Sequence, residues 1–153
     1  IHGFPTSGRD WRGVWPALAQ SHELFALDML GFGASAKPRD FDYSISASAD
    51  QWVALAEATG VREVAVIAHD YGNTVAQELL ARQREGELGF RISSVVFLNG
   101  GLFPEATRPL RIQRMLAGPL GPLLVRFVRE ARFKASLQRI CAQRWPEGEL
   151  DEA

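Results

Sequence analysis

The chain has 153 residues, 46% of them hydrophobic, and a formal net charge of -1. This length suits one domain with a sizeable core, and the near-neutral charge gives no reason to expect a nucleic-acid partner. The lone Cys141 excludes an internal disulfide and suits a reducing, cytoplasmic compartment. The sequence shows no membrane-spanning run, no signal peptide, and no motif for a metal or another cofactor. Because it begins at Ile1 and ends in an acidic tail, we expect a piece of a longer protein.

The first sixty residues predict short elements joined by turn-rich loops. In chain order they are a strand end at Ile1, a loop over 2–8, a helix from Asp10 to about Gln20, a strand over Leu24–Asp28, a loop over 31–38, and a helix from Ser44 or Ser46 to Thr59. Asp10 is placed to cap the first helix, and Gly60 is placed to end the second.

The central segment of the chain runs from Glu63 to Arg82. It opens with a short, β-branched apolar run, residues 64–68, which predicts a strand buried on both faces. It continues as a helix, whose apolar face is formed by Val75, Ala76, Leu79 and Leu80. A further apolar strand is expected at Ser94–Leu98. The alternation of strands and helices predicts a parallel α/β sheet.

Between this strand and this helix lies a pentapeptide with small residues at both ends, Ala68 to Gly72. A strand that turns abruptly into a helix brings backbone close to backbone, so only small residues fit two places either side of the apex. The apex residue, Asp70, is then expected in a strained conformation that exposes its side chain at the helix N-terminus. This is the geometry of a nucleophile elbow with Asp in place of Ser. The alternative is that Asp70 is only a helix N-cap.

The pattern changes after Asn99. Gly100 and Gly101 end the alternation, and residues 103–146 contain nine Lys or Arg but only two acids. Apolar residues between 116 and 128 follow helical spacing, interrupted by two prolines. We therefore expect a core over 1–102 and the start of a helical cap over 103–153. The basic stripe is more often a solvated helix face than a site for an anionic substrate or a membrane.

Three separated motifs carry a family resemblance: HGFP at 2–5, DMLGFGAS at 28–35 and HDYG at 69–72. In this order they resemble the branch of the α/β hydrolases that holds epoxide hydrolases and haloalkane dehalogenases. The segments HGFPTS, VAQELL and NGGLFPEATRPL are similar to the mesoderm-specific transcript hydrolases within it. The resemblance implies an α/β hydrolase fold, a parallel sheet flanked by helices with the start of a cap. It also implies that the chain is an internal fragment, truncated at both ends.

The resemblance and the elbow together assign a chemistry to Asp70. The reference pKa of Asp is about 3.9, so an Asp nucleophile, unlike Ser, needs no base to be ionised at neutral pH. In a dry pocket it can displace a leaving group from a small apolar organic substrate and form an alkyl-enzyme ester. Water would then attack the carboxyl carbon, and the backbone N–H groups of Phe4 and Tyr71 would hold the oxyanion. No cofactor is needed.

The remaining motif residues have supporting roles in this hypothesis. Gly3 permits a close approach of its loop to the elbow, and Pro5 fixes that loop. His2 is expected to hydrogen-bond its own loop rather than handle protons. Strand neighbours point to opposite faces, so His69 is expected to face away from the substrate of Asp70. Gly72 leaves room at the start of the helix.

Sequence differences from the two neighbouring enzyme families favour one reaction but leave alternatives open. Dehalogenases usually place Trp after the nucleophile, and one branch has Asn in the first loop, where this chain has Tyr71 and Phe4. Phe4 is instead similar to epoxide hydrolases, although these use cap tyrosines and no Tyr follows Tyr71 here. Epoxide hydrolysis is therefore the favoured reaction. A dehalogenase, another hydrolase, or a non-catalytic binding or signalling module are the alternatives.

The base that would activate water is also missing from the given sequence. In the resembling families it is a His beyond the last strand, whereas the chain has only His2, His22 and His69. A positioned base contributes about 10²–10⁴ in rate. We therefore expect residues 1–153 alone to be inactive in turnover.

Overall fold

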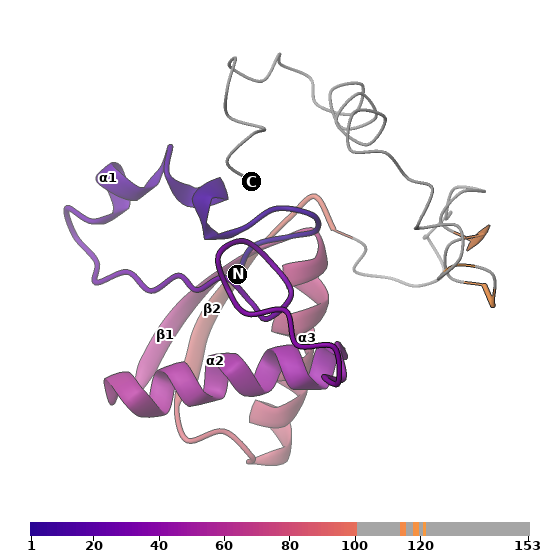
Figure 1. Ribbon diagram of the computed structural model, residues 1–153. Helices are drawn as coiled ribbons and strands as arrows, with labels where there is room; N and C mark the ends of the chain where they lie inside the picture. The colour runs from indigo at the N-terminus through magenta and orange to yellow at the C-terminus, as the bar shows by residue number, and fades with distance from the viewer. Residues whose placement is uncertain (101–113, 116–117, 120, 122–153) are drawn as a thin grey trace. The chain divides into compact units, whose positions relative to one another are not determined.

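The computed structural model describes residues 1–100, 114–115, 118–119 and 121. In chain order its elements are a 3₁₀ helix η1 (Gly8–Trp11), α1 (Trp15–Leu18), α2 (Ile45–Thr59), β1 (Glu63–His69), α3 (Tyr71–Glu85) and β2 (Arg91–Leu98) (Figure 1). The chain divides into two compact units, Ile1–Pro104 and Glu105–Ala153. The predicted cap over 103–153 lies almost wholly outside the described residues, so it stays a prediction.

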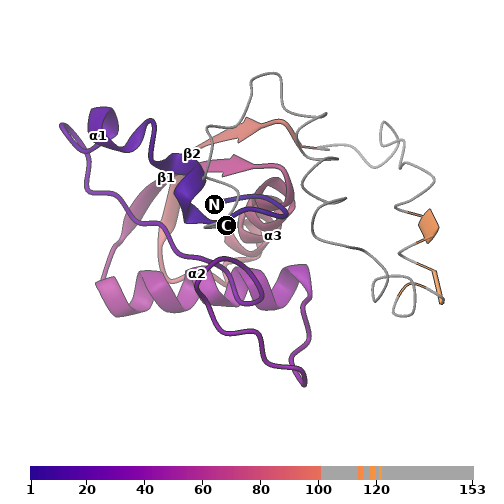
Figure 2. The ribbon, with the colours of Figure 1, turned by 45° about the horizontal axis from the view of Figure 1, so that its top comes forward.

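The two strands form a parallel sheet, as the alternating pattern predicts. Their register runs from the pair Glu63 and Arg91 to the pair His69 and Leu98, and Figure 2 shows them side by side. Ile1 continues the hydrogen bonding at the end of β1: the N–H of His69 donates to the Ile1 carbonyl at 3.0 Å. The strand end expected at Ile1 thus lies beside the strand that leads to Asp70.

Helix α2 begins and ends where the sequence predicts. The Ser44 hydroxyl accepts a hydrogen bond from the N–H of Ala47, and Gly60 ends the helix at a φ of 71°. This left-handed conformation carries no steric cost for glycine. α2 packs on α3, which in turn packs on both strands (Figure 1).

The core lies where these elements meet. Its buried members include three of the four residues predicted for the apolar face of α3, which are Val75, Ala76 and Leu79. The fourth, Leu80, packs partly buried against them. Ala49 from α2 and Ile92 from β2 complete the contact between the helices and the sheet.

Two secondary-structure predictions for the first third of the chain are wrong. The helix from Asp10 to about Gln20 is broken into η1 and α1, and Ser7 rather than Asp10 is the N-cap. Proline lacks an N–H and is tolerated only in the first helical turn, which is the place that Pro16 takes in α1.

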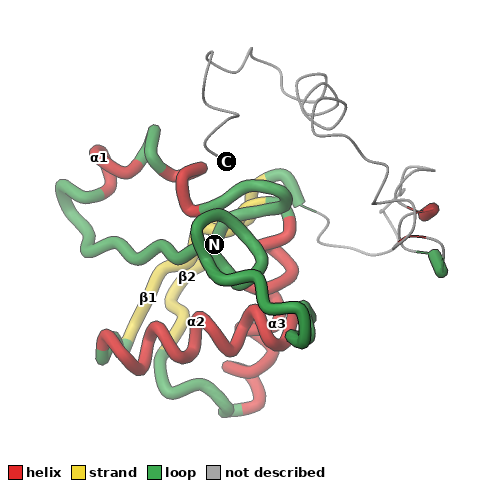
Figure 3. The backbone as a smooth tube through the Cα atoms, in the orientation of Figure 1, coloured by secondary structure: helices red, strands yellow, loops and turns green. Residues whose placement is uncertain are grey.

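The strand expected at Leu24–Asp28 is also absent. Residues 19–44 form loops and turns, drawn green in Figure 3. A strand needs a backbone partner, and in the part of the chain that the structure describes the sheet contains only β1 and β2.

The expected burial of β1 on both faces is likewise wrong. Only Ala68 is buried, and Ala65 is exposed. An apolar groove runs beside the strand, with Trp15, Phe25 and Leu55 among the side chains that line it. A continuous apolar run does not fix burial by itself, because burial depends on which elements cover the strand.

The helices that the structure describes are all too short or too polar to cross a membrane. Over the same residues, His, Cys, Asp and Glu side chains do not gather in any group that could hold a metal ion.

Candidate active site

The elbow predicted from the sequence is a single-residue turn at Asp70. β1 ends at His69 and α3 begins at Tyr71, while Asp70 adopts φ 49° and ψ -115°. A non-glycine residue in such a conformation costs about 1–3 kcal/mol and persists only where its surroundings hold it. Here its N–H donates to the Leu98 carbonyl at 3.0 Å, and its own carbonyl accepts from the N–H of Asn73 at 3.0 Å.

The side chain of Asp70 does not cap the helix that it precedes. Its Oδ1 instead accepts a hydrogen bond of 2.9 Å from the backbone N–H of Phe4. The carboxylate is therefore turned toward the HGFP loop, residues 2–5, and the N-cap alternative does not account for this orientation. The second expected donor to this carboxylate, the N–H of Tyr71, stays a prediction.

The small residues around the elbow allow this close approach. A Cβ on Gly3 would lie 2.6 Å from the Cβ of Asp70, and a Cβ on Gly72 would lie 2.6 Å from the carbonyl oxygens of Ile1 and His2. Ala68 is fully buried. Side chains larger than these would separate the HGFP loop from the turn, which explains the small residues on both sides of Asp70.

Aromatic side chains surround this backbone contact. The ring of Phe32 lies 6.1 Å from that of Phe4 and 5.8 Å from that of Tyr71, measured between centroids. Phe4 itself is 62% exposed. The Tyr71 hydroxyl lies 3.2 Å from the hydroxyl of Ser48. Next to Phe4, Pro5 follows a cis peptide bond.

His2 is fully buried, and both of its ring nitrogens are used. Nε2 accepts a hydrogen bond from the N–H of Met29 at 3.0 Å, so the proton of the neutral ring is on Nδ1. Nδ1 therefore donates to the Gly3 carbonyl at 2.9 Å. These contacts require the neutral ring, and burial lowers the pKa of His2 although the bond to Gly3 raises it. The ring therefore ties the HGFP loop to its own backbone, as expected, and also to residue 29.

We expect acid to loosen this loop through His2. Because the pKa of His2 is lower in the folded protein than the unfolded value of about 6.5, stability is lost as the pH falls below that value. Thermal unfolding of the full-length protein between pH 7.5 and 5, values chosen to span that pKa, measures the effect. The variant His2→Gln should show a flatter dependence, while His22→Gln, at an exposed position, should not. A wild-type slope in His2→Gln would contradict the prediction.

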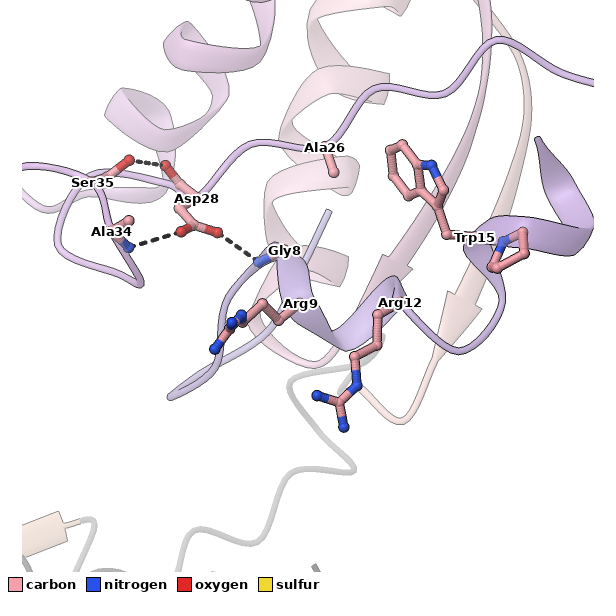
Figure 4. Close-up of a pocket in the computed structure, with 9 residues that line it drawn as sticks. Gly8, Arg9, Arg12, Trp15, Ala26, Asp28, Ala34 and Ser35 are labelled. Atoms are coloured by element: carbon pink, nitrogen blue, oxygen red, sulfur yellow. Dashed lines mark hydrogen bonds between the residues drawn. The ribbon is translucent and has the colours of Figure 1, made fainter. Parts of the chain in front are cut away.

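Asp28 fixes the second loop of the motif set. Its two carboxylate oxygens accept hydrogen bonds from the N–H groups of Gly8 at 2.7 Å and Ala34 at 2.8 Å (Figure 4). Burial would raise the pKa of Asp28, but these two N–H groups help to lower it overall. A hollow beside it is lined by Arg9, Trp15 and others, and Asp70 is not among them. Asp28 is thus a loop-fixing residue that also lines this hollow.

Two residues of the site lie where the sequence analysis did not expect them. Asp10 does not cap a helix: its Oδ2 lies 3.7 Å from Nδ1 of His69. His69 does not simply face away from Asp70, because its Nδ1 and the Oδ1 of Asp70 both lie 3.1 Å from the position of a Gly3 Cβ. The prediction for His69 assumed that side chains alternate between the two faces of a strand, and this alternation ends at Asp70, where φ is positive. No sequence signal links Asp10 to His69.

Comparisons with known proteins place the chain in a family. The model of the alpha/beta hydrolase fold family matches residues 1–139. The mesoderm-specific transcript homolog protein of Bos taurus is 46% identical over 134 residues, which are 84% of this chain and 40% of that protein. A haloalkane dehalogenase of Mesorhizobium japonicum is 36% identical over 89 residues, which are 58% of this chain and 28% of that enzyme.

A solved structure agrees with this assignment. An alpha/beta hydrolase fold protein from Burkholderia ambifaria matches with a TM-score of 0.77 and 27% identity, over 99% of this chain and 54% of that one. The chain thus spans about half of that protein, and 40% of the bovine relative. The expected resemblance is confirmed over the three motifs, all of which fall within the matched region. The chain belongs to the α/β hydrolase fold family.

Proposed function

We propose that the full-length protein is a hydrolase that uses Asp70 as its nucleophile, with an epoxide as the favoured substrate. One observation carries the proposal: Asp70 is held in a strained turn while its carboxylate faces the N–H of Phe4 instead of its own helix. Strain of this kind is concentrated at functional sites. A carboxylate that served only to cap α3 would need neither the strain nor the contact with the HGFP loop.

The two oxygens of Asp70 have different tasks in this mechanism. Oδ1 is engaged by Phe4, which leaves Oδ2 to attack. Oδ2 attacks one carbon of the epoxide, the carbon–oxygen bond of the ring breaks, and the alkoxide takes a proton from an acid. The product of this step is an alkyl ester of Asp70. Water gives a proton to a base and adds to the carboxyl carbon, so that negative charge builds on Oδ1. The intermediate then collapses and expels the second alkoxide, which takes the proton from the base to give the diol, and the carboxylate is regenerated.

The residues beside Asp70 favour an epoxide over a halide. The dehalogenases that the chain resembles hold the departing halide with side-chain N–H donors, and neither Phe4 nor Tyr71 has a side-chain N–H. The Tyr71 hydroxyl is within hydrogen-bonding distance of Ser48. The rings of Phe4, Phe32 and Tyr71 lie near one another beside the elbow, and such an apolar group suits a small apolar substrate. The proton donor for the alkoxide and the base for water are expected outside the described residues.

Isotope labelling tests the covalent route. The full-length protein is incubated with excess styrene oxide in water enriched in heavy oxygen, and the peptide that contains Asp70 is then analysed by mass spectrometry. Because water attacks the carboxyl carbon, repeated turnover should leave heavy oxygen in the Asp70 side chain. Label in the diol alone would mean direct attack of water on the epoxide, against the proposal. If neither the diol nor the label is formed, the result would favour the non-catalytic binding role.

A further inference from the structure

Three polar side chains near the elbow form a small cluster that the proposed reaction does not use. Asp10 comes from η1, Thr6 from the loop before it, and His69 from the end of β1. The Thr6 hydroxyl donates to Oδ2 of Asp10, and the same oxygen lies 3.7 Å from Nδ1 of His69. One carboxylate oxygen thus joins the N-terminal loop to the strand that leads to Asp70.

The side chains of His69 and Asp10 are partly sheltered, although Asp10 as a whole residue is exposed. The side chains of His69 and Asp10 are 33% and 21% exposed. Partly buried charges are screened less than those on the open surface, so attraction between the carboxylate and a protonated ring would resist separation of the two elements.

The cluster also reaches the backbone that holds Asp70. The Thr6 hydroxyl lies 3.3 Å from the carbonyl oxygen of Gly3, and the residue after Gly3 is Phe4, whose N–H donates to Asp70. The position of Asp10 is therefore transmitted through Thr6 to the peptide unit that orients the Phe4 donor. His69 anchors the other side, because it is the direct chain neighbour of Asp70.

We propose that Asp10 and His69 form a positioning pair, which holds the HGFP loop so that the N–H of Phe4 points at Oδ1 of Asp70. The inference rests on the proposed nucleophile for its kinetic consequence. Oδ1 becomes the carbonyl oxygen of the ester and gains negative charge only when water attacks. A misplaced Phe4 donor should therefore slow hydrolysis of the ester more than its formation, since donors act where charge develops.

The test uses the full-length protein with Asp10→Asn, with His69→Asn, and with both changes. Rapid quenching after mixing with styrene oxide, followed by intact-protein mass spectrometry, gives the rates of ester formation and ester hydrolysis separately. We expect each single variant to hydrolyse the ester about tenfold more slowly and to accumulate it. The double variant should be no slower than the single ones, because the two residues act as a unit. Asp10→Glu should recover part of the rate.

A second measurement needs no substrate. Amide hydrogen exchange in the peptide that contains Phe4 should be faster in Asp10→Asn and in His69→Asn than in the wild type. The matched controls are Asp42→Asn and His22→Asn, which change the same groups at exposed positions. If Asp10→Asn does not fold, Thr6→Val and His69→Asn decide the question.

Three outcomes would overturn the positioning pair. They are unchanged exchange and unchanged ester hydrolysis in the folded variants, additive slowing in the double variant, or equal slowing of both steps together with loss of stability. Failure of the proposed function looks different. In that case the wild type forms no ester at Asp70, so it does not differ from Asp70→Ala in this respect. The hydrogen-exchange measurement still decides whether the pair holds the HGFP loop.

Discussion

Replacing Asp70 by Ala is expected to abolish hydrolysis by the full-length protein while leaving the fold intact. The substitution removes the oxygen that is proposed to attack the substrate. Loss of a nucleophile that acts with its partners as a unit lowers kcat by about 10⁴-fold or more. The fold should survive because, among the described residues, the Asp70 side chain makes one hydrogen bond, to Phe4, and does not cap α3.

The measurement is turnover of an epoxide by the purified variant, with circular dichroism to establish that it is folded. Asp42→Ala is a matched control, since it removes an exposed carboxylate outside the site. Asn at position 70 is a poorer choice, because slow deamidation would restore the acid. Normal turnover by a folded Asp70→Ala protein would contradict the nucleophile assignment, whichever substrate the protein prefers.

The sequence predicts the elbow well because the elbow is local. The strand, the turn and the helix between Glu63 and Glu85 follow one another directly, and each has a short-range cause. These causes are the apolar run, the small residues Ala68 and Gly72, and the 3.6-residue spacing of the apolar face. Even the strained conformation at Asp70 can be anticipated, because the small residues two places either side of it indicate an abrupt turn from strand to helix. The structure has this turn, with one residue between β1 and α3.

The contacts of Asp10 and Asp28 could not be predicted in the same way, because they join loops far apart in the sequence. A carboxylate near the start of a helical pattern is usually a cap, yet Asp10 faces His69, and Ser7 takes the cap. The strand expected at Leu24–Asp28 fails for a related reason. Its composition is suitable, but a strand exists only where a backbone partner is available.

The face that His69 presents is a third case of this kind. Strand alternation is a reliable rule only while the backbone stays extended. The backbone of Asp70 is not extended, because its φ is 49°. The side chains on either side of the turn therefore no longer follow the alternation of a strand. The strained turn on which the proposed nucleophile rests is therefore also the reason why the prediction for His69 fails.

Replacing Gly3 by Ala is expected to lower kcat by about 10²–10³, the usual effect of losing one oxyanion donor. The new Cβ would lie 2.6 Å from the Cβ of Asp70 and 3.1 Å from both Oδ1 of Asp70 and Nδ1 of His69. A contact of 2.6 Å between two Cβ atoms cannot be relieved by rotating a side chain, so the backbone of the HGFP loop has to move. That movement carries the N–H of Phe4 away from Oδ1, to which it now donates at 2.9 Å.

The matched control is Gly13→Ala, because a Cβ at Gly13 would meet no atom of the described residues within 4 Å beyond its two chain neighbours. Neither glycine has the left-handed backbone that would penalise alanine by itself, so the two variants differ only in what the added methyl group meets. Epoxide turnover by both full-length variants, together with their melting temperatures, gives the answer. Gly3→Ala should retain most of its stability but lose its rate, whereas Gly13→Ala should keep both. If Gly3→Ala turned over at the wild-type rate, the Phe4 N–H could not be the donor that stabilises charge on Asp70.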